Sequence, residues 1–281
     1  MLKHVKMHSA KQPNTKKHTY MGSQAIQGKL WGHNPKDWAA IQEATGKPGY
    51  DFVLKTLTPT TVTKLLDVGC GSGYFCNLAQ ATGANVTGMD ASDAMIEEAK
   101  LRAPSIKFLT GDLEELPFED DSFDVVCGFN SFQYAASTKN ALAEAKRVLK
   151  PGGKLAAMIW GNKEDCESSS FLAALGSLLP PPPPGAAGPF ALTENHLLES
   201  ILQEVGFSIL ENQDIVSVWD YADADTALKG LLSTGVTAKA VEYSGWEKVR
   251  QIVSASMQQF IQPNSHVVYN NKFRVVIAEK P

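Results

Sequence analysis

The sequence predicts an α/β fold: a seven-stranded, mostly parallel sheet with helices on both faces, an antiparallel last strand and a helical cover. Three observations support this. Short apolar runs alternate with helical patterns from about residue 64 onward, which is typical of parallel sheets. An apolar strand breaks into a glycine turn at Leu65–Gly73, where a helix should begin. Acidic residues follow the next two predicted strands, where parallel sheets bind ligands.

Composition limits the classes of function. The chain has 281 residues, 43% hydrophobic and 20% charged, which suits a globular protein with one large domain plus inserts. A formal net charge of −4 argues against nucleic acid as a partner, and nothing indicates a membrane partner. The four cysteines lack C-x-x-C spacing, so we expect reduced thiols in a cytoplasmic protein, without a metal site or disulfide framework.

Changes in composition divide the chain into five parts. The first 19 residues are basic and have no apolar run of the kind found in signal peptides, which predicts a flexible tail. Aromatic residues begin after it, and Asn34 with Pro35 is expected to cap a helix there. The predicted parts are a tail at 1–19, a helical cover segment at 20–50, a core at 51–219 with a proline-rich insert at 161–190, a second helical cover at 220–263, and the final strand of the core at 264–281.

The glycine turn contains Gly69, Gly71 and Gly73 at alternate positions. Without a Cβ atom, each can take a positive φ and let the backbone approach a ligand that faces helix N–H groups. A dinucleotide fingerprint needs glycine at the sixth position, where this chain has Tyr74, so a nicotinamide oxidoreductase is disfavoured. Asp67 precedes the turn and could accept its N–H groups or reach toward a cationic ligand.

The second predicted strand, Asn85–Met89, ends at Asp90. A carboxylate there can accept hydrogen bonds from two ribose hydroxyls, although NAD-binding proteins also have an acid at a similar distance. Ser92 is expected to cap the following helix, which carries Met95 on its inner face.

The third strand, Ile106–Thr110, leads into a Gly-Asp-x-x-x-Leu-Pro-Phe-x-x-x-x-Phe-Asp pattern that ends at Asp124. We interpret its remaining acids as solvated loop charges: Glu114, Glu115, Glu119, Asp120 and Asp121. The fourth strand, Phe123–Phe129, places a polar and aromatic group at its carboxyl end, facing the reacting centre: Asn130, Ser131, Phe132, Gln133 and Tyr134.

The rest of the chain completes the predicted sheet. Ser137 or Thr138 begins a helix, and the fifth strand follows at Lys154–Trp160. Five prolines from residue 180 form either a stiff surface connection or a ligand for a proline-binding module. Thr193 is expected to cap the next helix, after which come a strand at 208–219, the second cover and the last strand. This order predicts a Rossmann-like sheet with five parallel strands ahead of a C-terminal hairpin.

Leu66–Gly73, the Gly-Asp pattern and the Arg-Val-Leu-Lys-Pro-Gly-Gly run resemble the class I S-adenosylmethionine-dependent methyltransferases. The likeness is greatest to the small-molecule branch that includes the ubiquinone-biosynthesis type. It implies S-adenosyl-L-methionine as cofactor, with Asp67 near its methionine end, Asp90 at the ribose and Met95 beside the adenine. The full set of cofactor residues that the resemblance implies is Asp67, Gly69, Gly71, Gly73, Asp90, Ala91, Met95, Asp112, Leu113 and Asn130.

The resemblance implies transfer of a methyl group to an oxygen, nitrogen or carbon nucleophile of a small molecule by in-line displacement. Candidate catalytic residues are His33, the candidate base, and Tyr134, and candidate substrate contacts are Trp31, Gln133 and Tyr134. Two alternatives stay open: a methyltransferase that acts on a peptide or protein, and a non-catalytic module that binds the cofactor. The sequence does not determine the oligomeric state.

Overall fold

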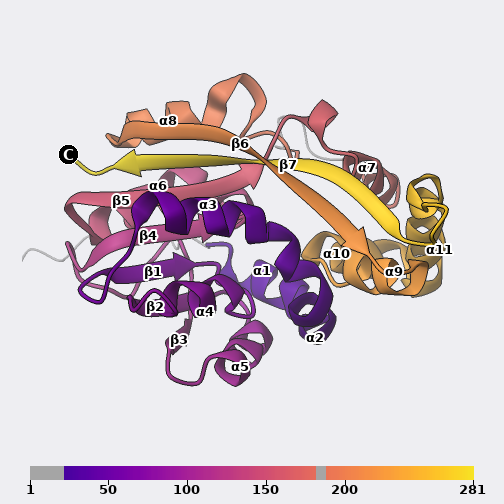
Figure 1. The fold of residues 1–281 in the computed structure, drawn as a ribbon. Coiled ribbons are helices and arrows are strands. Elements are labelled where there is room, and N and C mark those ends of the chain that lie inside the picture. Colours follow the sequence, from indigo (N-terminus) through magenta and orange to yellow (C-terminus); the bar gives the residue numbers. More distant parts are fainter. Residues whose placement is uncertain (1–21, 182–187) are drawn as a thin grey trace, which may run out of the picture.

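One seven-stranded sheet runs through the protein in the order β3-β2-β1-β4-β5-β7-β6 (Figure 1). The computed structural model describes residues 22–181 and 188–281, so the predicted tail at 1–19 and much of the proline run lie outside the described residues. The strands are β1 (Lys64–Val68), β2 (Asn85–Asp90), β3 (Lys107–Thr110), β4 (Phe123–Phe129), β5 (Leu149–Trp160), β6 (Ser208–Tyr221) and β7 (Val267–Glu279).

Strand directions confirm the predicted fold class. The pairs β1–β2, β1–β4, β2–β3 and β4–β5 are parallel. Strand β7 is antiparallel to both of its neighbours and lies between β5 and β6. Its residues 275–278 are buried without alternation, because an interior strand has both faces covered.

Helices cover both faces of the sheet. One face carries α3 (Lys47–Leu57), α4 (Tyr74–Gln80) and α5 (Asp93–Arg102), and the other carries α6 (Thr138–Val148) and α8 (Leu197–Val205) (Figure 1). Four apolar residues of α6 recur at helical spacing and are buried: Ala141, Leu142, Ala145 and Val148. The side chain of Ser92 accepts the N–H of Met95, which confirms the predicted cap of α5.

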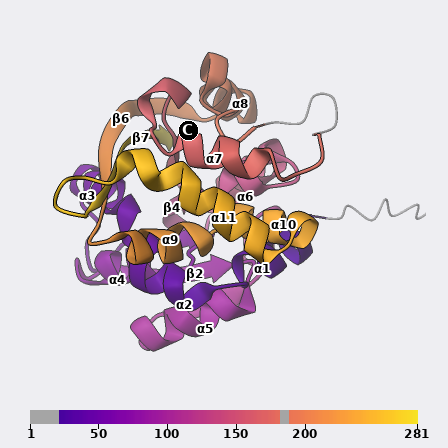
Figure 2. The same cartoon turned by 90° about the vertical axis from the view of Figure 1, so that its right-hand side faces the viewer.

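Further helical elements gather at the carboxyl ends of the parallel strands (Figures 1 and 2). The N-terminal ones are α1 (Gln24–Trp31), α2 (Pro35–Asp37), a π-helical turn (Trp38–Gln42) and a 3-10 turn (Glu43–Gly46). Between β6 and β7 come α9 (Ala224–Leu232), α10 (Gly235–Ser244) and α11 (Trp246–Met257), with α7 (Ser169–Gly176) packed on α11. We call residues 24–46 the N-terminal cover; α1 contacts α10, and the π turn contacts α9.

Two predicted caps are wrong. Asn34 makes no capping bond, because its amide Nδ2 donates to Asp37 Oδ2 at 2.7 Å. The hydroxyl of Thr193 donates instead to the carbonyl of Trp160, and α8 begins after His196, which has a left-handed φ of 54°.

The interpretation of Glu114 as a solvated charge is also wrong. Glu114 is buried, and its carboxylate accepts the N–H groups of Ala136 and Ser137 at 2.7 and 2.8 Å. A carboxylate that satisfies buried backbone donors has a structural role.

Among the residues that the structure describes, no helix is both long and apolar enough to cross a membrane.

Two buried tyrosines on β6 and β7 give a matched test of the core. Tyr221 donates its hydroxyl to Gln42 Oε1 at 2.7 Å, whereas the hydroxyl of Tyr269 has no hydrogen-bond partner within residues 22–181 and 188–281. We expect Tyr221→Phe to lower the free energy of unfolding by about 1–3 kcal/mol, since it leaves a buried amide oxygen unpaired. Tyr269→Phe should be neutral or stabilising. Urea denaturation measures both changes, and equal losses in the two variants would contradict the assignment.

Candidate functional site

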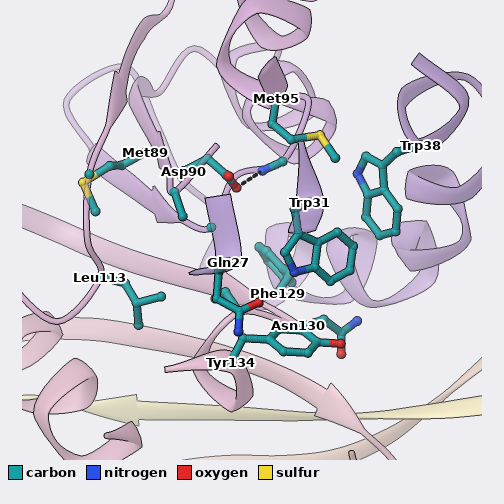
Figure 3. A pocket seen from close by; sticks show the side chains of 15 residues that line it. Gln27, Trp31, Trp38, Met89, Asp90, Met95, Leu113, Phe129, Asn130 and Tyr134 are labelled. Carbon is teal, nitrogen blue, oxygen red and sulfur yellow. Dashed lines mark hydrogen bonds between the residues drawn. The ribbon is translucent and has the colours of Figure 1, made fainter. Parts of the chain in front are cut away.

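A pocket lies at the carboxyl ends of β1, β2 and β4, beneath the N-terminal cover (Figure 3). The lining residues are Gln27, Trp31, Trp38, Gly69, Gly71, Met89, Asp90, Ala91, Met95, Gly111, Leu113, Phe129, Asn130, Ser131 and Tyr134. Within residues 22–181 and 188–281, no cluster of three His, Cys, Asp or Glu side chains could hold a metal ion.

The glycine turn forms the floor of the pocket. Gly69, Gly71 and Gly73 have φ values of 77°, 53° and 77°, in the left-handed region that favours glycine. The turn is held against β2, because the N–H groups of Gly69 and Cys70 both donate to the carbonyl of Met89, at 2.7 and 3.0 Å. A Cβ atom on Gly69 would lie 2.3 Å from the Cβ of Ser131, so a side chain there would push the ends of β1 and β4 apart.

Asp90 is fixed by two backbone donors. Its Oδ2 accepts the N–H of Gly71 at 2.9 Å, and its Oδ1 accepts the N–H of Ser92 at 2.8 Å. Burial raises the pKa of Asp90 to about 6, although these bonds oppose the shift. Each carboxylate oxygen can accept a further bond, so Asp90 is oriented without being saturated.

The surroundings of Asp67 differ from those expected. Its side chain is 1% exposed and lies outside the pocket lining. Its Oδ2 accepts a hydrogen bond from the Cys76 thiol, with Sγ at 3.4 Å. The predicted bonds from the turn to Asp67 are absent, because the carbonyl of Met89 and the carboxylate of Asp90 take the N–H groups of residues 69–71. Burial raises the pKa of Asp67 to about 8, so the side chain carries a proton at neutral pH.

Glu43 fastens the N-terminal cover to the turn. Its carboxylate accepts the N–H of Ser72 at 2.8 Å, and also the hydroxyl of Ser72 and the guanidinium of Arg102. Arg102 in turn donates to the carbonyls of Ser72 and Ala39 at 2.8 and 2.7 Å. Burial raises the pKa of Glu43, and the charge of Arg102 opposes that shift. One ion pair therefore joins the cover, the turn and α5.

Three aromatic rings form the wall opposite Asp90 (Figure 3). Trp31 meets Trp38 and Tyr134 edge-on, with ring centroids 4.9 and 5.4 Å apart. Helix α10 supports this wall at Gly235, where a Cβ atom would lie 2.8 Å from the ring of Trp31. Helix α1 comes even closer to the loop after β2, because a Cβ on Gly28 would lie 2.3 Å from the carbonyl oxygen of Ala91.

The structure brings most of the predicted site residues together. Those that line the pocket are Trp31, Gly69, Gly71, Asp90, Ala91, Met95, Leu113, Asn130 and Tyr134. Asp67, Gly73, Asp112, Gln133 and His33 lie outside the lining. Gln133 still touches it, since its amide donates to Asn130 Oδ1 at 3.2 Å.

Two of the residues outside the lining have other surroundings than expected. Asp112 accepts the N–H groups of Gln24 and Glu114 at 3.1 and 2.9 Å, so its carboxylate ties the start of α1 to the loop after β3. His33 is exposed in the turn after α1. His33 does not line the pocket, and its role as a base stays a prediction.

Sequence reasoning missed five lining residues, which are Gln27, Trp38, Met89, Gly111 and Phe129, whereas Ser131 was expected to face the reacting centre. Met89 and Phe129 directly precede Asp90 and Asn130 at strand ends. Their position next to predicted site residues could have identified them as lining residues. Gly28 and Gly32, four residues apart in the α1 region, signal a close approach of that helix.

Comparison with known proteins gives matches to methyltransferases. Residues 66–157 match the family model of a methyltransferase domain. The chain is 38% identical over 103 residues to malonyl-[acyl-carrier protein] O-methyltransferase of Erwinia pyrifoliae, covering 37% of this chain and 39% of the relative. It is 34% identical over 140 residues to 27-O-demethylrifamycin SV methyltransferase of Amycolatopsis mediterranei, covering 45% and 51%.

The fold also matches solved structures. The [4+2]-cyclase SpnF aligns with a TM-score of 0.53 and 21% identity, covering 83% of this chain and 80% of that one. This likeness shows a shared fold, on which different chemistries occur. The chain matches only about half or less of the length of the two curated relatives.

Asp67 gives a prediction about pH. Its pKa is about 8 when folded and near 4 when unfolded, so between these values the folded state binds more protons and stability falls as the pH rises. We expect Asp67→Asn, which resembles the protonated acid, to flatten this fall between pH 5 and pH 8. Urea denaturation at both pH values measures it.

Asp124→Asn is the control, because bonds to Lys150 and Lys64 lower the pKa of Asp124. Its effect should be the same at pH 5 and pH 8. A pH profile of Asp67→Asn as steep as that of the parent would contradict the prediction.

Proposed function

We propose, from the premise that the chain contains a class I S-adenosylmethionine-dependent methyltransferase domain, that it transfers a methyl group to a small-molecule nucleophile. The observation that carries this proposal is the pocket itself. A glycine turn and an oriented carboxylate form one side, and an aromatic wall held by Glu43 and Gly235 forms the other. This arrangement can bind a nucleoside and keep water from a reacting centre.

The described residues fit S-adenosyl-L-methionine. Asp90 has acceptor capacity left for ribose hydroxyls, and its neighbour Ala91 lines the same side. Met95 and Leu113 are apolar lining residues that would hold the adenine, and the Cβ-free Gly69 and Gly71 leave room beside the turn. When bound, this cofactor supplies an electrophilic methyl group on a sulfonium ion.

The side chains indicate catalysis by positioning. Asp90 and Tyr134 are the ionisable groups among the described lining residues. Burial raises the pKa of Tyr134 to about 12, so at neutral pH its phenol can donate a hydrogen bond but cannot accept a proton as a base. The aromatic wall can exclude water and orient the nucleophile, and such positioning accounts for large rate effects without a base.

A small acceptor suits this site best. The pocket lies beneath the N-terminal cover, and two rings of that cover, Trp31 and Trp38, line it. The two curated relatives are named for different acceptors, a carrier-protein-bound malonyl group and a rifamycin. We propose an oxygen, nitrogen or carbon nucleophile with Tyr134 and Trp31 beside it.

Cofactor binding tests the proposal. We expect isothermal calorimetry to detect binding of S-adenosylmethionine and of S-adenosylhomocysteine, without binding of NAD. Asp90→Asn should weaken the affinity for S-adenosylmethionine about ten- to a hundredfold, because one charge-assisted hydrogen bond is worth about 1.5–3 kcal/mol.

Asp93→Asn is the matched control, since Asp93 is an exposed acid three residues after Asp90, at the start of α5. Its affinity should equal that of the parent. Binding of NAD without a response to S-adenosylmethionine would refute the proposal.

Turnover tests the role of the wall. Phenols, amines and carboxylates are screened with methyl-labelled S-adenosylmethionine, and the productive acceptor is then used with two variants. Tyr134→Phe should lower kcat/KM about two- to tenfold through the loss of one neutral hydrogen bond. His33→Ala should match the parent, because His33 is exposed and outside the lining.

A tenfold loss in His33→Ala would restore this residue as a candidate base. Cofactor binding without turnover of any small acceptor would instead favour a peptide or protein acceptor, or a non-catalytic binding module.

A further inference from the structure

Two buried polar atoms of the pocket lack partners. The indole nitrogen of Trp38 and the hydroxyl of Ser131 are shielded from solvent, and neither has a hydrogen bond to any residue in the ranges 22–181 and 188–281. Both residues line the pocket. Buried polar atoms in native proteins are nearly always paired, so two orphans in one pocket indicate polar groups of a ligand.

Each of these two atoms lies close to a glycine of the turn. A Cβ atom on Gly71 would lie 3.2 Å from the Trp38 nitrogen, and one on Gly69 would lie 3.2 Å from the Ser131 hydroxyl. Figure 3 shows the Trp38 ring next to Trp31, with its nitrogen on the edge that faces the other lining residues. Glu43 is the nearby acid, and its carboxylate already accepts from Ser72 and Arg102.

The chemistry of the two unpaired atoms indicates which group of a ligand they would bind. An indole N–H can only donate, so Trp38 requires an acceptor. The described lining contains no lysine, arginine or histidine, so an anionic group of a ligand must be held by neutral donors. Carboxylate oxygens are the strongest acceptors that an amino-acid ligand offers, and hydrogen bonds to them are about twice as strong as neutral ones.

We propose that Trp38 Nε1–H, assisted by the Ser131 hydroxyl, binds the carboxylate at the amino-acid end of S-adenosylmethionine. This inference rests on the proposed function and adds an anchor that belongs to the N-terminal cover. Trp38 begins the π turn that leads to Glu43. The cover is thus attached at two points, to the glycine turn through Glu43 and to the cofactor through Trp38, so cofactor binding stabilises the closed cover.

Decarboxylated S-adenosylmethionine tests the anchor, because it lacks only the carboxylate. We expect Trp38→Phe to weaken the affinity for S-adenosylmethionine about ten- to a hundredfold and to leave the affinity for the decarboxylated compound unchanged. This comparison is a double-mutant cycle between one side chain and one ligand group. Phenylalanine keeps an aromatic ring against Trp31, and the thermal midpoint without ligand checks that the variant is folded.

Trp31→Phe is the matched control, since it changes the neighbouring ring of the same wall. It should alter the affinities for both compounds by the same factor. Ser131→Ala should show the pattern of Trp38→Phe with a smaller change.

Two outcomes would overturn the anchor while leaving the proposed function intact. One is an equal loss of affinity for both compounds in Trp38→Phe, which would mean that Trp38 acts by packing. The other is no loss for either compound. Failure of the parent protein to bind S-adenosylmethionine would refute the proposed function and the anchor together.

Discussion

A buried carboxylate joins the parts of the protein that must meet for the pocket to exist. Glu43 comes from the N-terminal cover, Ser72 from the glycine turn and Arg102 from the end of α5. Burying a lone charge would be unfavourable, but here one cation and several donors surround it. Removing Glu43 or Arg102 would leave the other charge without its partner, so the three segments are fixed as a unit. The aromatic wall depends on this attachment, because Trp38 lies five residues before Glu43.

The parts of the site that the sequence predicts are those whose chemistry is local. The glycine turn needs positive φ at successive positions, and Asp90 stands directly at a strand end, so residue type and spacing carry the information. The residues that hold this part of the site in place from distant segments carry no such local signal. Glu43 bonds to residues 29 and 59 positions away, and no pattern in a single sequence marks such a pair. Asp67 shows the same limit, since its motif was identified while its surroundings, a thiol and apolar side chains, came only from the packing.

Burial also determines how the acids of the site behave. Asp67, Asp90 and Glu43 lie near one another at the carboxyl end of the sheet, and burial raises the pKa of each. Arg102 is the cation bonded to one of them, and the others are held by neutral donors. A positive charge brought close to these acids would lower their pKa values again, because an opposite charge favours the ionised form. The same environment leaves Tyr134 a neutral donor.

The position of β7 has a consequence for biosynthesis. This strand is made after the other six, yet it occupies an interior place between β5 and β6. Until the ribosome has released it, β6 cannot join the sheet, and the buried contacts from Ser217 to Thr45 and from Tyr221 to Gln42 cannot form. Those contacts connect the N-terminal cover to the end of β6 across about 170 to 180 residues of chain. A nascent chain can thus assemble the glycine turn early, while enclosure of the pocket waits for the final strand.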